Sequence, residues 1–454
     1  MGQLMLDTKA AVLMPLARLP LPEQANKRAI TIIKGEHMTS RHSMTLLAAL
    51  LGTLGATGSA SAETVEERLA RTEARLAAIE NRQQSTSDWQ DRLTVHGFAT
   101  LASRSTNTLR NAAGEKIRFE DTGTDLDLTS LTRAGLRIET EINDRTDFVV
   151  QLLAEGEDDF DAQMQWAYIS YDINPALTFR AGRLVLPVFM HSQYTQASYA
   201  YPWVELPSQV YGILPVDTME GLDFSLRFNT GPLSHLANLT YGSTDVAGFE
   251  VDDQAGINLT SYLGNWTTRL SYAVGQTSIA LPDLSPMGPN LAQLSFDEEF
   301  GYFASAGLQY DNGRLLVMSE WVQLSQNAPK NSFPTQSATY IFTGYRFGPY
   351  MPHVTWTSSY SDDDNRCATL ASPVDQAGCV GTVAGSISQS KSWTFGLRYE
   401  LAPGVSLKAE AQRFYDFSND GDTNGVLFVG ANGTSNVPAD DEAAVFRFAI
   451  DAAF

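Results

Sequence analysis

The feature that most constrains this 454-residue chain is an alternation of apolar and polar side chains that begins near Arg92 and recurs to the C-terminus. In residues 221–228, the even positions are Leu or Phe, and the odd positions after the glycine are Asp223, Ser225 and Arg227. Successive side chains of a strand point to opposite faces, so such segments predict strands with one apolar face. Many run for about 9–11 residues, the length that crosses a bilayer at a tilt. The clearest are 132–143, 221–228, 392–400, 405–414 and 445–454.

The connections between these segments alternate in length. Seven are short turns built on Gly, Pro or Asn, at 143–145, 174–175, 230–232, 264–265, 312–313, 348–349 and 402–404. Eight are longer, near 103–131, 156–162, 184–219, 243–255, 275–299, 325–337, 361–390 and 415–441. Short turns on one rim and long loops on the other are typical of outer-membrane barrels. The sequence therefore predicts an all-β fold, a 16-stranded antiparallel transmembrane β-barrel over residues 92–454, preceded by a short α-helical coiled coil.

The N-terminal region has the features of an export signal. Residues 38–62 combine a charged start at Met38, an apolar run from Met44 to Leu54 and the small-residue site Ala60-Ser61-Ala62. This pattern predicts a bacterial signal peptide that is cleaved after Ala62. We interpret residues 1–37 as an over-extended N-terminus. The alternative is a signal anchor with a cytoplasmic tail, but the apolar run is too short to span a membrane.

Residues 63–91 predict a periplasmic coiled coil followed by a linker. The core positions Leu69, Leu76 and Ile79 belong to a heptad pattern between residues 65 and 83. Leu at position a with β-branched residues at position d favours three or more helices over two. About three heptads cannot hold an oligomer by themselves, so a larger interface must form beside them. The alternative is a single amphipathic helix that lies on the barrel.

The polar rows of the predicted strands define candidate pore-lining residues. Sixteen strands enclose an aqueous channel rather than a packed core. The rows carry at least as much positive as negative charge, and as a set they indicate a screen that favours anions. Alternatively, each arginine belongs to the barrel wall and its charge is paired with a carboxylate. The candidates are Arg133, Arg137, Arg180, Arg227, Arg269, Arg346, Arg398, Lys408, Arg447, Glu139, Glu320 and Glu410.

The connection at 184–219 is too apolar to extend freely into water, so we expect it to fold inward as a constriction loop. The alternative is an aromatic girdle with a trimer contact. Its few charges are chiefly Glu205 and Asp217, so it offers no basic cluster that would trap phosphate. The residues that carry this prediction are Pro187, Tyr194, Tyr199, Tyr201, Trp203, Glu205 and Tyr211.

Composition and motifs exclude several classes of function. A formal net charge of −21 argues against a nucleic-acid partner. No nucleophile elbow, metalloprotease motif or phosphate-binding glycine loop occurs, so we expect no enzyme, cofactor or metal centre. An outer-membrane phospholipase with a Ser/His pair is the alternative. Cys367 and Cys379 lie in one exported loop and predict a disulfide. The nearby acids at 362–364 predict either a solvated loop or a loose divalent-cation site at the lipopolysaccharide surface.

Four features together carry a family resemblance: the heptads at 65–83, the strand end at 181–183 followed by Pro187, the strand end at 344–348, and the terminal Phe454. The chain resembles bacterial trimeric porins with an N-terminal coiled coil, particularly the DcaP-like porins. The resemblance implies a homotrimer among outer-membrane lipid and lipopolysaccharide, with its coiled coil in the periplasm. It also implies passive diffusion of small hydrophilic solutes, with a preference for small organic anions such as dicarboxylates.

The last strand ends on an aromatic residue, as bacterial outer-membrane proteins do. Phe454 resembles the C-terminal signal that barrel-assembly machinery reads, so that machinery is an expected partner. A different reading of the whole chain is a structural or adhesive barrel that links envelope layers and transports nothing.

Overall fold

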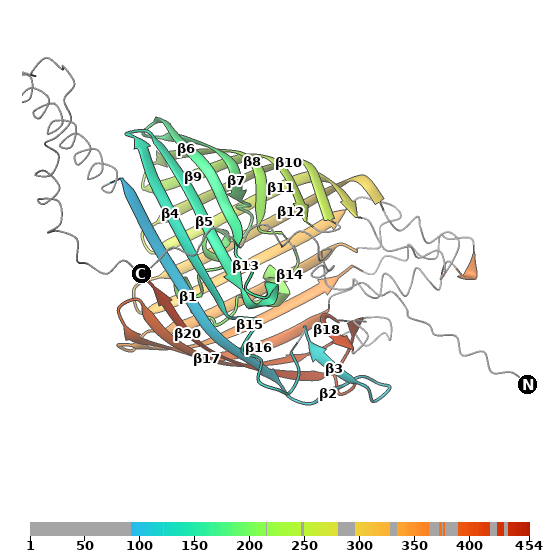
Figure 1. Cartoon of the computed structure of the whole chain (residues 1–454). Coiled ribbons are helices and arrows are strands. Elements are labelled where there is room, and N and C mark those ends of the chain that lie inside the picture. Colours follow the sequence, from blue (N-terminus) through green and yellow to red (C-terminus); the bar gives the residue numbers. More distant parts are fainter. Residues whose placement is uncertain are drawn as a thin grey trace, which may run out of the picture. The chain divides into compact units, whose positions relative to one another are not determined.

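The strands of this protein form one closed barrel in the computed structural model (Figure 1). The structure describes residues 92–454 except 121, 215, 247–248, 280–295, 327–333, 363–371, 375, 377–388, 418–424 and 431–434. Sixteen antiparallel strands pair with their neighbours around the barrel, and β1 (Leu93–Thr106) pairs with β20 (Glu442–Ala453) to close it. The predicted fold class, a 16-stranded antiparallel barrel, is confirmed. The coiled coil, the signal peptide and residues 1–37 lie outside the described residues.

The remaining barrel strands run in chain order. They are β4 (Arg133–Asn143), β5 (Thr146–Glu155), β6 (Gln163–Asn174), β7 (Leu177–Val185), β8 (Thr218–Thr230), β9 (Leu233–Val246), β10 (Phe249–Leu263), β11 (Trp266–Ile279), β12 (Phe296–Asp311), β13 (Leu315–Gln326), β14 (Gln336–Tyr345), β15 (Tyr350–Ser361), β16 (Ser390–Ala402) and β17 (Val405–Tyr415). The described residues include no helix that is both long and apolar enough to cross a membrane.

Alternation along the strands sorts side chains between the outer surface and the interior. In β8, Leu222 and Phe224 are each 40% exposed on the outer surface. Asp223 lies between these two residues and Ser225 follows Phe224. Both point inward, and they are 2% and 4% exposed. The barrel therefore presents apolar side chains outward and polar ones inward, which is the opposite of a soluble sandwich core.

All seven predicted short turns are present, but the predicted long connection at 243–255 is wrong. Strand β9 continues to Val246 and β10 begins at Phe249, so only two residues join them. The acidic run after Val251 suggested a loop, yet it forms a bulge inside β10, where Asp253 adopts a positive φ of 47°. A bulge places an extra polar residue in a strand without ending it.

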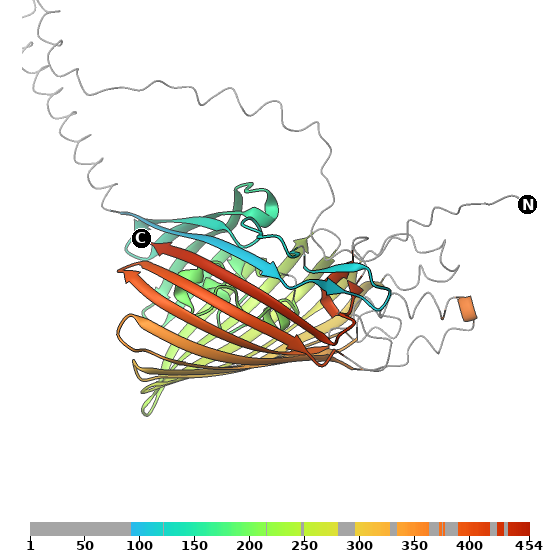
Figure 2. The same cartoon turned by 90° about the horizontal axis from the view of Figure 1, so that it is seen from below.

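The first and last long connections contain strands that the sequence patterns did not predict. Strands β2 (Leu109–Arg110), β3 (Lys116–Phe119), β18 (Gly425–Gly430) and β19 (Ser435–Asn436) form a second sheet in the order β19-β18-β3-β2. Figure 2 shows β2, β3 and β18 beside β1 and β20, at the end of the barrel away from the short turns. Phe119, Phe414 and Phe428 pack together beneath this sheet.

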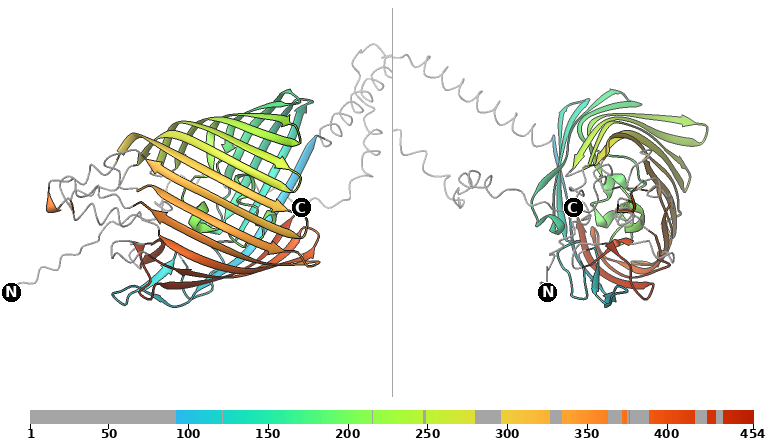
Figure 3. Two further views of the ribbon diagram at one scale, coloured as in Figure 1. Left: turned by 180° about the vertical axis from the view of Figure 1, so that it is seen from behind. Right: turned by 90° about the vertical axis from the view of Figure 1, so that its right-hand side faces the viewer.

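The connection between β7 and β8 lies inside the ring of strands, as the view along the barrel shows (Figure 3, right). It contains three short helices, η2 (Ser192–Tyr194), η3 (Ser198–Ala200) and α2 (Ser208–Tyr211). Its apolar side chains are deeply buried, with Trp203 1% and Val210 0% exposed. We refer to residues 186–217 as the inward loop. A separate short helix, η1 (Gly156–Asp158), lies in the connection between β5 and β6.

Candidate functional site

Lys408 fastens the inward loop to the barrel wall. Its Nζ donates hydrogen bonds to the carbonyl oxygens of Ser198, at 2.5 Å, and Trp203, at 2.7 Å. The same nitrogen lies 3.0 Å from a carboxylate oxygen of Asp451 on β20, and both side chains are fully buried. The strand pattern placed Lys408 on the lumen row as a pore-lining candidate. Its side chain points inward, and its charge holds the loop.

Two predicted pore-lining arginines also donate to loop carbonyls. Arg398 on β16 donates to Tyr199 at 2.8 Å and to Tyr201 at 2.9 Å. Arg269 on β11 donates to Pro187 at 2.6 Å. A loop folded away from bulk water needs partners for its backbone polar groups, and the charged wall supplies them.

Wall carboxylates accept hydrogen bonds from the same loop. Glu320 on β13 accepts from the backbone N–H of Met190 at 2.6 Å and from the Tyr211 hydroxyl at 2.7 Å. Glu410 on β17 accepts from the backbone N–H of Val204 at 3.1 Å. Three basic and two acidic wall residues therefore hold the loop from several strands.

Glu205 of the inward loop contacts two further wall residues. The Nε of Arg447 on β20 donates to Glu205 at 2.7 Å, and Arg104 on β1 lies 3.6 Å from it. Burial by itself would raise the pKa of Glu205, but the guanidinium groups of Arg447, Arg104 and Arg133 together hold that pKa below its usual value.

The aromatic residues of the loop form its apolar core. The Trp203 ring lies 4.8 Å from the Phe342 ring, and its Nε1 donates to Thr355 at 2.8 Å. His191 is bonded through Nδ1 to the Tyr194 hydroxyl at 2.8 Å. Burial lowers the pKa of His191 to about 3 and raises the pKa of Tyr194 to about 12, so both side chains are neutral near pH 7.

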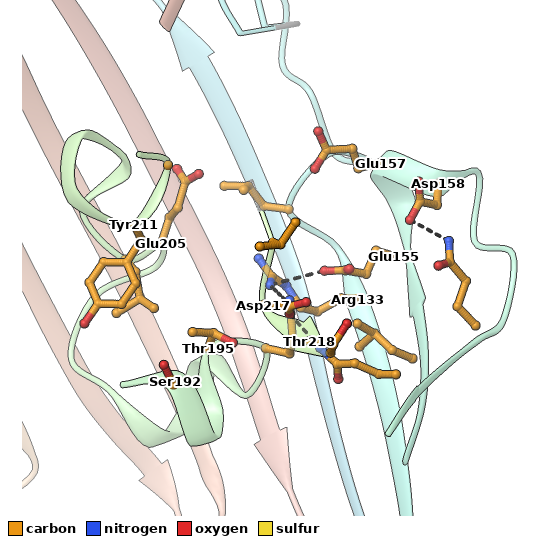
Figure 4. A pocket seen from close by; sticks show the side chains of 18 of the residues that line it. Arg133, Glu155, Glu157, Asp158, Ser192, Thr195, Glu205, Tyr211, Asp217 and Thr218 are labelled. Atoms are coloured by element: carbon orange, nitrogen blue, oxygen red, sulfur yellow. Dashed lines mark hydrogen bonds and ion pairs between the residues drawn. The ribbon is translucent and has the colours of Figure 1, made fainter. Parts of the chain in front are cut away.

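A pocket of about 530 Å³ lies between the inward loop and the wall, toward the long connections; we call it the outer pocket. Among the described residues that line it, seven carry carboxyl groups and three carry guanidinium groups. Figure 4 shows Glu157 and Asp158 on one side of the pocket and Glu205 with Tyr211 on the other. Burial, reinforced by the charges of Glu155 and Glu205, raises the pKa of Glu157. This pocket is acidic overall.

Arg133 lies at the floor of the outer pocket. It donates to Gln196 of the inward loop at 2.6 Å and lies 3.3 Å from Glu155. Asp217, at the end of the loop, accepts hydrogen bonds from Gln165 at 3.0 Å and from Gln196 at 3.1 Å. Arg133 and two side-chain amides therefore connect the loop to the wall, and Figure 4 labels Arg133 and Asp217 in this region.

A second pocket of about 370 Å³ lies toward the short turns; we call it the inner pocket. Its described lining contains four arginines and two acids. Arg180 lies 2.7 Å from Asp223, and Arg137 lies 2.7 Å from Glu139. The side chain of Arg227 donates to the Thr178 hydroxyl, at 3.3 Å, and forms no ion pair with any described residue. The arginines are Arg137, Arg180, Arg227 and Arg269, and the acids are Glu139 and Asp147.

Arg346 does not lie on the interior wall. It follows the end of β14 and donates to Asp311 at 2.7 Å, at the rim formed by the short turns. The strand pattern placed it on the lumen row, although residues 344–348 also have the pattern of a strand end. The predicted disulfide between Cys367 and Cys379 lies outside the described residues, and no described residues group as a metal site.

Sequence analysis missed part of the pocket lining. Arg104 on β1 and the acids Glu157, Asp158 and Asp161 line the outer pocket. The acidic run from residue 157 indicated a charged loop, but nothing in the sequence showed that this loop lies over the channel.

A closed barrel of sixteen strands with polar pockets on both sides of an inward loop defines a porin-type architecture. The sequence matches no protein-family model and no curated protein. Among solved structures, the barrel is similar to OmpF of Salmonella typhi, in a complex with daunomycin, at 12% identity and a TM-score of 0.51, covering 80% of this chain and 97% of that one.

Two other solved structures are similar. One is an anion-selective porin from Comamonas acidovorans, at 13% identity and a TM-score of 0.50, covering 80% of this chain and 99% of that one. The other is the outer membrane channel DcaP of Acinetobacter baumannii, at 12% identity and a TM-score of 0.47, covering 80% and 97%. This chain has the fold of bacterial outer-membrane porins, and the predicted porin resemblance is confirmed at the level of the fold.

Proposed function

We propose that this protein is an outer-membrane porin through which small hydrophilic solutes diffuse passively. The observation that carries the proposal is the pair of polar pockets, of about 530 and 370 Å³, on opposite sides of the inward loop within one closed barrel. Apolar side chains on the outer surface suit contact with lipid. The fixed loop then sets the width of the path.

We propose further that the inner pocket favours small organic anions, with dicarboxylates as the first candidates. Its described lining has two more arginines than acids, and Arg227 has no carboxylate partner there. A solute comes closest to the wall in the smaller pocket, where an uncompensated charge acts over a few ångströms at a dielectric below that of water. The carboxylate and guanidinium groups of the larger outer pocket act on solutes before they reach the inner pocket.

The proposed assembly follows the family resemblance. We propose a homotrimer in the outer membrane, surrounded by lipid and lipopolysaccharide, with residues 63–91 in the periplasm. Phe454 would direct the chain to the barrel-assembly machinery.

Conductance in a planar lipid bilayer tests the proposed function. The purified protein, added at nanomolar concentration, is expected to produce discrete steps of current that persist without an energy source. Release of an uncharged trisaccharide from proteoliposomes is expected at the same time. A folded barrel that gave neither current steps nor trisaccharide release would contradict the porin proposal and favour a structural or adhesive barrel.

A further inference from the structure

The two pockets carry opposite excess charge along the barrel axis. The described lining of the outer pocket has four more carboxyl than guanidinium groups. The inner pocket has four arginines and two acids in its described lining, and Asp223 beside it pairs with Arg180, which leaves an excess of one arginine. Asp217, in the outer pocket, accepts only amide hydrogen bonds and pairs with no described cation. In the inner pocket, the buried Nε of Arg269 has no hydrogen-bond partner, and its side chain is 9% exposed.

The spacing between the two pockets can be read along β5. Val149 lines the inner pocket and Glu155 lines the outer pocket. Six residues of strand span about 20 Å at about 3.3 Å each. A strand tilted by about 40° advances about 15 Å along the barrel axis over that length. The acidic and basic zones are therefore separated by roughly the length of a short extended peptide, since an extended chain spans about 3.3–3.6 Å per residue.

We propose that this channel favours extended zwitterions, specifically peptides of about three to five residues with a free ammonium group and a free carboxylate. The proposal rests on the proposed porin function and names a solute class for it. When such a peptide lies across the inward loop, its ammonium group occupies the acidic outer pocket while its carboxylate reaches the arginines of the inner pocket.

Solutes with a single sign of charge lack this match. An anion such as a dicarboxylate is attracted only in the inner pocket, and a cation is attracted only in the outer pocket. Only a solute with both charges, held apart by about the pocket spacing, finds both zones favourable at once, so its barrier at the loop is lowest.

Flux of matched peptides through proteoliposomes tests the proposal. The three solutes are tetraglycine, its N-acetylated form, which is an anion, and its C-amidated form, which is a cation. Potassium with valinomycin holds the membrane potential at zero, and release is measured by mass spectrometry. Tetraglycine is expected to leave at least about threefold faster than either modified form, a ratio that corresponds to about 0.7 kcal/mol or more.

Two variants assign the effect to the two pockets. Asp161→Asn with Asp217→Asn removes charge from the outer pocket, so N-acetyl-tetraglycine is expected to become as fast as tetraglycine. Arg227→Gln removes charge from the inner pocket, so the amidated form is expected to be released as fast as tetraglycine. The matched control is Asp125→Asn with Asp440→Asn, two exposed acids that line neither pocket. This control is expected to keep the wild-type order.

The outcomes separate this inference from the porin proposal. Release of the uncharged trisaccharide by each variant shows that it is folded and open, and each peptide rate is divided by the trisaccharide rate of the same variant. If no solute crosses, including the trisaccharide, the proposed function itself fails. If the trisaccharide crosses while the three tetraglycine forms leave at equal rates, or the acetylated form is fastest, the zwitterion inference is overturned and the porin proposal stands.

Discussion

At the scale of single residues, the interior charges have two distinct roles. Lys408, Arg398 and Arg269 donate to backbone carbonyls of the inward loop, whereas Arg227 faces the inner pocket without an ion pair among the described residues. The period-two pattern predicted that all four point inward. It could not separate the roles, because the loop carbonyls lie 82 to 210 residues away from the side chains that donate to them, and nothing local to a strand records such a contact.

Replacing Lys408 with Met is expected to destabilise the barrel and loosen the inward loop. The change would leave the buried Asp451 carboxylate without its cation, and breaking a buried pair from one side costs about 3–5 kcal/mol. The midpoint of urea unfolding should fall, and the single-channel current should become larger and noisier. Lys391→Met is the matched control, because Lys391 pairs with Asp416 at an exposed position, where such pairs contribute about 0–1 kcal/mol. Equal midpoints for the two variants would count against a fastening role for Lys408.

His191 is expected to make the folded protein less stable as the pH falls below about 6.5. Burial, with a smaller contribution from Arg269, lowers its folded-state pKa to about 3, so the unfolded chain binds a proton in this window and the folded chain does not. The loss between pH 6.5 and pH 5 should reach about 2 kcal/mol, since one pKa unit corresponds to about 1.4 kcal/mol.

Urea unfolding at several pH values checks this expectation. His191→Gln should reduce the pH dependence between pH 6.5 and pH 5, because glutamine does not titrate. His96→Gln, at an exposed position on β1, should keep the wild-type profile. A wild-type profile in the His191 variant would show that protonation of this ring does not limit stability.

At the scale of elements, strands and short turns were predictable, but distant pairings were not. Gly, Pro and Asn mark backbone reversals locally, so all seven short turns could be located from the sequence. The β9–β10 connection could not, because a bulge at Asp253 carries the same polar residues as a loop. The second sheet pairs β3 with β18, about 300 residues apart, and its strands are too short to show a pattern.

The strand pair that closes the barrel depends on a glycine. Gly97 on β1 exchanges two backbone hydrogen bonds with Phe454, at 2.8 and 2.9 Å. A Cβ atom at Gly97 would lie 2.3 Å from the Phe454 ring. Gly97→Ala is therefore expected to lower the folded yield in detergent, measured by the mobility shift between heated and unheated samples.

A second substitution separates this contact from a general effect of alanine in a strand. Gly97→Ala combined with Phe454→Leu is expected to recover part of the yield, because the smaller side chain leaves room for the added methyl group. Folding in detergent excludes any effect of Phe454 on the assembly machinery. If the double variant folds no better than Gly97→Ala alone, the ring contact does not govern closure.

At the scale of the whole molecule, the class of fold could be predicted from the sequence. The pockets along the path of a solute through the barrel could not. Strand number, loop asymmetry and the terminal aromatic residue are each readable along the chain, and together they predict one closed barrel. The two pockets combine side chains from β1, from β4 to β9, from β11, from the inward loop and from η1, so their charge balance depends on three-dimensional packing. The trimer and the coiled coil stay predictions from residues 65–83.

The most direct test of the channel account is the reversal potential of single channels in a KCl gradient, for the wild type, Arg227→Gln and Arg413→Gln. Arg413 is exposed, lies on β17 and lines neither pocket, so it is the matched control for loss of one positive charge. The account predicts stepwise conductance in all three, a reversal potential shifted toward cation preference in Arg227→Gln, and no shift in Arg413→Gln. Absence of current steps from the folded wild type, or equal reversal potentials in all three proteins, would contradict it.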